Sequence, residues 1–228
     1  ALSADNHGDR PAFQGELISF AELDIYKDYQ ASQDGLLQQF CEQLTGLKGE
    51  PQVVSSVAEA GAALAEITAA GGLVAGSDSV SGKNVLLQDS ELLRSVLAAV
   101  PEPYRQSFQL IPADTGCEDR PEIDNNSFSR PGFGVTECDL LIARSGGVAL
   151  RTISAGGRRL SVLPEHHIVI ARADQIVAGL MPWYEMIMNE PDWSYGVVIT
   201  GPSRTSDIEK ILVLGAHGPK RLSVIIIR

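Results

Sequence analysis

The sequence is poor in cysteine, with only Cys41, Cys117 and Cys138 among 228 residues. The three lie far apart, are odd in number and include no C-x-x-C pair. This pattern excludes a disulfide framework and the usual cysteine ligand sets of zinc and iron–sulfur sites. We therefore expect a reducing, cytoplasmic location.

Long apolar runs and basic residues are also scarce. No run of about 18 apolar residues occurs, so no segment is predicted to span a membrane. Residues 1–15 lack the basic start and apolar core of a secretory signal, although the chain begins with Ala1, which leaves room for a missing natural N-terminal piece. There are 18 basic and 29 acidic residues, and residues 1–93 hold 4 and 14 of them. The acidic front argues against binding to nucleic acid or an anionic membrane surface.

Motifs for nucleotides and metals are missing as well. The sequence has no Walker loop, no G-x-G-x-x-G and no recognisable nucleophile–base pair. His166 and His167 are adjacent, so in a strand they point to opposite faces and do not readily bind one metal ion. We predict neither a cofactor nor a metal site.

The sequence is rich in short apolar segments that alternate with helical patterns. Helices are predicted over 35–47, 57–70 and 90–100, and strands at 53–54, 85–87, 160–163 and 168–171. This alternation, largely without hairpin turns, predicts an α/β three-layer domain. We place an N-terminal extension, an arm plus a helix, at 1–50 and the α/β domain at 51–228. Residues 112–132 read as an excursion over the surface.

The most informative stretch runs from Tyr195 to Arg228. Its apolar run at 197–199 ends at a polar turn, after which Ser206 and Glu209 form a capping box and Asp207 suits the first turn of a helix. Backbone N–H groups at a helix start favour anions. Ser203, Arg204 and Thr205 are therefore candidates to hold a carboxylate or phosphate, and Asp207 and Glu209 are further candidate ligand-binding residues. The alternative is a well-capped connection in which Arg204 makes a structural ion pair.

A second capping box is predicted from Thr136 and Asp139. Thr136, Glu137 and Asp139 could instead line the same cleft as residues 203–205. Glu137 is also a candidate acid or base, because a cap does not need it. The turn at Ser145 and Gly146 could present backbone N–H groups to a carboxylate, or be a plain turn.

Other candidates come from the histidines and a neighbouring carboxylate. Glu165 is a candidate to move a proton to or from a hydroxy acid, together with one of the two adjacent histidines, for which His166 is the named candidate. His217 lies in a sharp turn before the last strand, where it either reaches the ligand site or bonds to backbone.

Three segments carry a family resemblance. They are GVTECDLLIARSGGVAL at 134–150, PEHHIVIARADQIV at 164–177, and YGVVITGPSRTSDIEKILVLGAHGPKRLSVIII at 195–227. The string T-G-P-S-R-T-x-D-I-E is specific. The chain resembles the lactate utilization protein C family, LUD-domain proteins also called LutC or YkgG. The match is close from about Gly132 onward.

The resemblance implies a Rossmann-like domain of the kind shared by glucosamine-6-phosphate isomerase, ribose-5-phosphate isomerase and CoA transferases. It also implies a part in oxidising L-lactate to pyruvate beside iron–sulfur-containing partner proteins. One departure is Arg144-Ser145-Gly146-Gly147, where many relatives have E-T-G-[ST]. The missing glutamate weakens a claim of independent catalysis.

Three functions follow as hypotheses. The first is an accessory or substrate-handling subunit that binds a small carboxylate or phosphate. The second is a stand-alone isomerase or CoA-transferase-like enzyme with Glu137 or Glu165 as base. The third is an interaction module without a ligand, whose acidic front docks partners.

Overall fold

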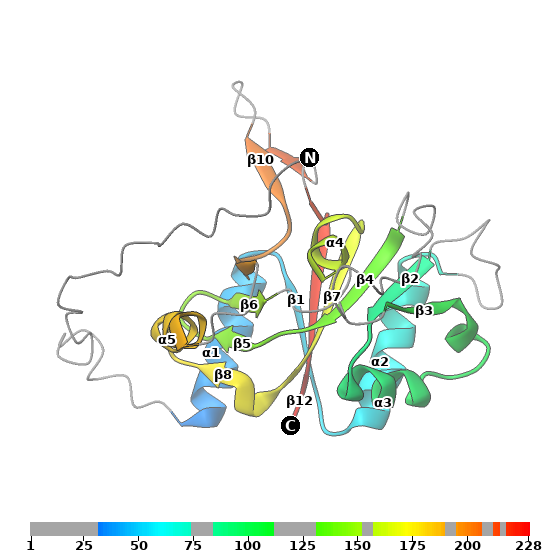
Figure 1. The fold of residues 1–228 in the computed structure, drawn as a ribbon, viewed down its shortest axis with the longest axis horizontal. Coiled ribbons are helices and arrows are strands. Elements are labelled where there is room, and N and C mark those ends of the chain that lie inside the picture. Colours follow the sequence, from blue (N-terminus) through cyan, green and yellow to red (C-terminus); the bar gives the residue numbers. More distant parts are fainter. Residues whose placement is uncertain are drawn as a thin grey trace, which may run out of the picture. The chain divides into compact units, whose positions relative to one another are not determined.

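A six-stranded, wholly parallel sheet forms the centre of the fold in a computed structural model (Figure 1). The structure describes residues 32–73, 84–111, 131–151, 157–189, 195–206, 212–214 and 218–228. The sheet has the spatial order β1 (Glu50–Val54), β12 (Arg221–Ile227), β7 (His166–Arg172), β4 (Pro131–Glu137), β2 (Asn84–Gln88) and β3 (Phe108–Ile111).

A smaller sheet packs on one face of the large one. Its order is β8 (Ile176–Val177), β5 (Leu140–Ile142), β6 (Gly147–Arg151) and β9 (Gly196–Ile199). A separate hairpin pairs β10 (Arg204–Ser206) with β11 (Leu212–Leu214) in antiparallel fashion. The helices are α1 (Gln33–Gly46), α2 (Val57–Ala70), α3 (Glu91–Ala99), α4 (Gly157–Val162) and α5 (Met181–Asn189), with 3₁₀ turns at Tyr104–Ser107 and Ala173–Gln175.

Two hydrophobic cores lie on opposite faces of the large sheet. On one face, α2 and α3 bury Leu64 and Leu93 against Phe133 and Ile225. On the other face, α1 and the small sheet enclose a second core (Figure 1). Strand β12 contributes side chains to both cores. Its residues from Leu222 to Ile227 are all buried, as expected of a parallel strand covered on both faces. The predicted three-layer α/β fold is confirmed.

Two of the helices begin directly after a serine that caps an amphipathic segment. The Ser56 hydroxyl accepts a hydrogen bond from the Glu59 N–H, and the Ser90 hydroxyl accepts one from the Leu93 N–H. Each bond satisfies a donor that the helix itself leaves free. The helices predicted at 57–70 and 90–100 are confirmed.

The N-terminal part is described only from Ser32 onward. Helix α1 packs its apolar side, including Phe40 and Leu44, into the second core. Residues 31–228 form one compact unit. The predicted arm lies outside the described residues, as does most of the predicted excursion at 112–132, and the boundary at residue 50 stays a prediction.

Two other predictions were wrong. Residues 160–163 do not form a strand, because α4 occupies 157–162 and buries Leu160 against the sheet. Thr136 does not cap a helix, because it continues β4 and pairs in register with Val169 of β7. Asp139 accepts hydrogen bonds from the Arg151 backbone N–H at 2.6 Å and from the Arg151 guanidinium at 2.8 Å. Strand pairing and this ion pair replace the predicted box.

Candidate functional site

A cavity of about 250 Å³ lies at the amino-terminal ends of β7 and β12, beside β9. Pockets for drug-sized ligands have roughly 300–1,000 Å³. This cavity therefore suits a smaller molecule. Its lining consists of Ser161, Val162, His167, Tyr195, Val197, Ile199, Thr200, Gly201, Pro202, Ser203, Gly218, Pro219 and Leu222.

His167 is the most distinctive side chain of the lining. It is only 1% exposed, and its Nε2 lies 2.9 Å from the Thr136 hydroxyl. The other ring nitrogen, Nδ1, is buried and has no hydrogen-bond partner in the part of the chain that the structure describes. A buried polar atom without a partner is costly and calls for an explanation, such as a ligand or water.

The ring of His167 is neutral near neutral pH. Burial, together with the smaller effect of the charge of His166, lowers the pKa of His167 to about 3. A neutral imidazole has one N–H donor and one acceptor nitrogen. It can therefore meet a hydroxyl or a carbonyl group, but it does not supply a positive charge.

His166 points to the opposite face, as strand alternation predicts. Its Nε2 lies 2.8 Å from the Ser223 hydroxyl, which donates to Glu50 Oε2 at 2.7 Å. Burial raises the pKa of Glu50, but the bonds from Ser223 and Arg221 and the charges of Arg221 and His166 outweigh this effect and lower it. His166, predicted as a catalytic candidate, is not part of the cavity lining.

One wall of the cavity is held by close backbone contacts. The Ser203 N–H donates to the Pro219 carbonyl at 2.8 Å, and a Cβ on Gly218 would lie 3.2 Å from the Ser203 Cβ. Gly201 has φ +109°, and a Cβ there would lie 2.9 Å from the Leu47 carbonyl oxygen. Glycine fits this left-handed conformation and this spacing.

The opposite wall comes from α4, which lies directly on β4. A Cβ on Gly134 would lie 2.0 Å from the Leu160 carbonyl oxygen and 2.5 Å from the Pro164 Cγ. The missing side chain at Gly134 is what allows this approach. The next two residues of α4, Ser161 and Val162, line the cavity.

The predicted ligand residues fall into four groups, of which the turn at Ser145 and Gly146 is described below. Ser203 lines the cavity, and Thr136 lies behind it in contact with His167. Arg204 and Thr205 belong to β10, and the structure describes their backbone only. Residues Asp207, Glu209 and His217 lie outside the described residues.

The helix predicted after Ser206 would begin at residues 207–211, which lie outside the described residues. Ser206 is the last residue of β10 and pairs with Leu212 of β11. Leu212, Val213 and Leu214 form β11 and pair with β10, so the predicted helix does not extend through these three residues. The described lining near Ser203 belongs to a cavity beside β7, β12 and β9.

The turn at Ser145 and Gly146 joins β5 to β6 away from the lining. The Ser145 N–H donates to the Ile142 carbonyl at 3.3 Å. Gly146 has φ +62° and faces α1, where a Cβ would lie 2.6 Å from the Leu44 nitrogen. These contacts match the plain-turn interpretation, and a ligand role for either residue stays a prediction.

Glu165 lies on the surface next to the last strand. Its carboxylate is 3.5 Å from the Lys220 ammonium, and its backbone carbonyl accepts a bond from the Lys220 N–H at 2.8 Å. Glu165 is absent from the cavity lining, so its predicted role as a base has no support from the cavity.

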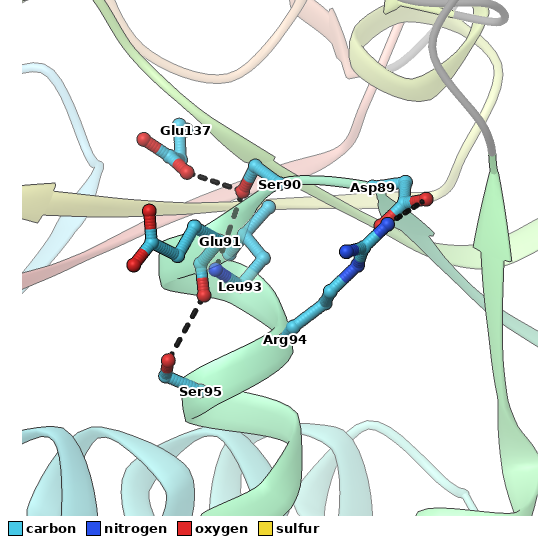
Figure 2. Close-up of polar contacts among 7 residues, drawn as sticks. All are labelled: Asp89, Ser90, Glu91, Leu93, Arg94, Ser95 and Glu137. Carbon is cyan, nitrogen blue, oxygen red and sulfur yellow. Dashed lines mark hydrogen bonds and ion pairs between the residues drawn. The ribbon is translucent and has the colours of Figure 1, made fainter.

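Glu137 lies at a different place, the carboxyl ends of β2 and β4. Figure 2 shows the Ser90 hydroxyl between the Glu137 carboxylate, to which it donates, and the first turn of α3. The Glu137 N–H donates to Gln88 Oε1 at 3.1 Å. Thr136 and Glu137 are consecutive strand residues and face opposite ways, so they do not share a site.

This second location is a topological switch point. The chain leaves β2 through α3 on one face and leaves β4 toward the small sheet on the other face. Ligands of open α/β sheets often bind at such points. Glu137 therefore stays a candidate acid or base, separate from the cavity.

Sequence reasoning did not choose His167 over His166, and it missed Thr200 and the cavity itself. The adjacency of the two histidines showed that they face opposite ways. It did not show which face the small sheet covers, because that depends on contacts between distant segments. No group of three or more potential metal ligands converges within the ranges that the structure describes. None of the described helices combines the length and apolar character needed to cross a bilayer.

The geometry defines a parallel-sheet α/β domain with a small cavity whose described lining residues are uncharged. A family model named LUD domain matches residues 37–227, and the chain belongs to this family. It is similar to a DUF162 family protein of known crystal structure from Deinococcus radiodurans, with a TM-score of 0.56 and 21% identity over 87% of this chain and 99% of that one. That likeness concerns the fold.

Curated relatives include lactate utilization protein C of Deinococcus radiodurans, 34% identical over 58% of this chain and 61% of the relative. Lactate utilization protein C 1 of Bacillus mycoides is 36% identical over 42% and 43%. The uncharacterized protein YkgG of Escherichia coli is 34% identical over 41% and 43%. The chain thus spans about two fifths to three fifths of the length of these relatives.

Proposed function

We propose that the chain is an accessory or substrate-handling subunit of a cytoplasmic L-lactate utilization system. In this proposal it binds a small organic acid of the lactate and pyruvate class in the cavity at His167. The names of the relatives support the process, and the cavity supports the handling of a small ligand. The observation that carries the proposal is a small cavity lined by a buried imidazole whose Nδ1 has no partner.

Electron transfer would belong to iron–sulfur-containing partner proteins. Of the cysteines in the described ranges, Cys138 is buried, and burial together with nearby Asp139 and Glu137 raises the pKa of its thiol. A buried, protonated thiol is a poor metal ligand. The chain would therefore handle the ligand while its partners move the electrons.

Arg204 supplies the charge in this proposal. It follows Ser203, which lines the cavity, and a guanidinium can form a charge-assisted bond to a carboxylate. Such bonds contribute about 1.5–3 kcal/mol, which corresponds to a tenfold or larger change in affinity. The alternative of a stand-alone enzyme would place the ligand near Glu137 instead.

Calorimetry tests the role of Arg204. We expect heat on titrating the chain with L-lactate or pyruvate, and at least tenfold weaker binding after Arg204→Ala. Arg94→Ala is the matched control, because Arg94 is an exposed arginine paired with Asp89 at 2.7 Å on α3. Equal affinities for all three proteins would remove Arg204 from the site. If neither L-lactate nor pyruvate gives heat on titration, the proposed function is contradicted.

A further inference from the structure

The part of the cavity lining that the structure describes is uncharged. Its side chains comprise apolar groups such as Val197, Ile199 and Leu222, hydroxyl groups such as Thr200 and Ser203, and the imidazole of His167. None of these lining residues is Asp, Glu, Lys or Arg. A carboxylate taken into such surroundings would lose its hydration without gaining a cation, which is costly.

The ring of His167 offers a hydrogen-bonding nitrogen for an uncharged oxygen of a ligand. Its Nδ1 is buried and unpartnered, while Nε2 is bonded to Thr136 at 2.9 Å. Imidazole tautomers are set by the bond that the other nitrogen makes. When the Thr136 hydroxyl donates to Nε2, Nδ1 carries the proton and donates. When Nε2 donates to Thr136, Nδ1 accepts.

We propose that the cavity takes the uncharged, oxygen-bearing end of a small 2-hydroxy or 2-oxo acid, that the His167 ring bonds to this oxygen, and that Thr136 positions the ring. The carboxylate then stays at the mouth of the cavity. This inference rests on the proposed function and adds the orientation of the ligand and the group that recognises it. A hydroxyl can donate to Nδ1 or accept a bond from it, whereas a carbonyl can only accept.

The apolar part of the lining fits the rest of such a molecule. Val162, Val197 and Leu222 present hydrocarbon surface that a methyl group or short chain can cover. A three-carbon acid therefore places its methyl group against these residues and its 2-oxygen toward the ring. Propionate has the same chain and carboxylate but lacks the oxygen, so it is the matched ligand for a test.

Thr136 has the role of a positioning residue because it contacts the ring and is not among the lining residues. Thr136→Val keeps the shape of the side chain but removes the hydroxyl that bonds to Nε2. The His167 ring is then free to rotate or to change tautomer. Thr136→Ser keeps the hydroxyl. Thr68→Val is the control for the loss of a buried threonine hydroxyl, because Thr68 bonds to the Leu64 carbonyl of its own helix, α2.

The experiment measures the affinities of the full chain for L-lactate, pyruvate and propionate by calorimetry, for the wild type and these variants. We expect lactate or pyruvate to bind about tenfold more tightly than propionate to the wild type, to Thr136→Ser and to Thr68→Val. In Thr136→Val the difference should fall to about threefold or less. A preference for lactate identifies the ring as acceptor, and a preference for pyruvate identifies it as donor.

Nitrogen-15 NMR of the histidine rings gives a second measurement. Ligand binding would not change the His167 ring shifts if His167 had only a structural role. We expect the His167 Nδ1 and Nε2 shifts to change on adding the preferred acid and to stay unchanged with propionate. Equal affinity of the wild type for all three acids would overturn the inference and leave the proposed function standing. If none of the acids binds, both fail. Discrimination that persists in Thr136→Val would remove Thr136 from the positioning role.

Discussion

Gly134→Ala should destabilise the protein more than most single methyl additions. The added Cβ would lie 2.0 Å from the Leu160 backbone oxygen, which cannot move unless α4 shifts. Overpacking of this kind costs about 1–3 kcal/mol and sometimes more. We expect at least about 3 kcal/mol, or a fall in melting temperature of roughly 6–12 °C for a chain of this size.

Gly46→Ala is the control for this variant. A Cβ at Gly46 meets nothing within 4 Å, and the residue lies at the end of α1. Thermal unfolding followed by circular dichroism should show an unchanged or slightly higher melting temperature there, since alanine favours a helix over glycine by up to about 1 kcal/mol. A stable Gly134→Ala protein would show that α4 does not lie on β4 in this way, and the wall of the cavity would be lost with it.

The second large effect is a loss of stability in mild acid. In the folded protein burial lowers the pKa of His167 to about 3, whereas an unfolded histidine has a pKa of about 6.5. Between these values the unfolded chain binds one proton more at this position, so stability falls as the pH falls. The slope approaches about 1.4 kcal/mol per pH unit, which gives roughly 3 kcal/mol by pH 4.5.

Urea unfolding between pH 7 and pH 5 isolates this effect. Glu50 and Asp89 also have lowered pKa values, the latter through its bond to Arg94, but they destabilise the fold only below their ordinary pKa values of 4.5 and 3.8. His167→Asn should have a distinctly shallower dependence of the unfolding free energy on pH than the wild type. Identical slopes in the two proteins would mean that His167 is not buried in its neutral form.

The sequence was sufficient to predict helices and strands whose local signals favour the same structure as their tertiary contacts. Ser56 and Ser90 each precede an amphipathic helix, and each caps it by accepting a backbone hydrogen bond. The run from Leu222 to Ile227 reads as a buried parallel strand and is one. In these cases propensity, capping and burial all favour one structure.

Prediction failed where a local signal competed with a distant contact. Thr136 and Asp139 match a capping box, yet Thr136 extends β4 beside β7. Residues 160–163 are apolar enough for a strand, but Gly134 leaves space for a helix there. A capping signal is small, and pairing with a buried strand outweighs it.

The candidate site was predicted only in part for the same reason. Ser203 and Thr136 were named as ligand residues, and both lie at or next to the cavity. The histidine that meets the cavity is His167 and not His166. Choosing between the two requires knowing which face of β7 the small sheet covers, and no local pattern contains that information.

The most direct test of the proposed ligand site is a methyl NMR titration of the chain with L-lactate. The proposed site predicts that the methyl signals of Val162, Ile199 and Leu222 shift together and saturate. Those of Val85 and Leu93, on the other face of the sheet beside α3, should stay in place. Shifts confined to the surroundings of Glu137, or none at all, would contradict the proposal that the cavity at His167 is the ligand site.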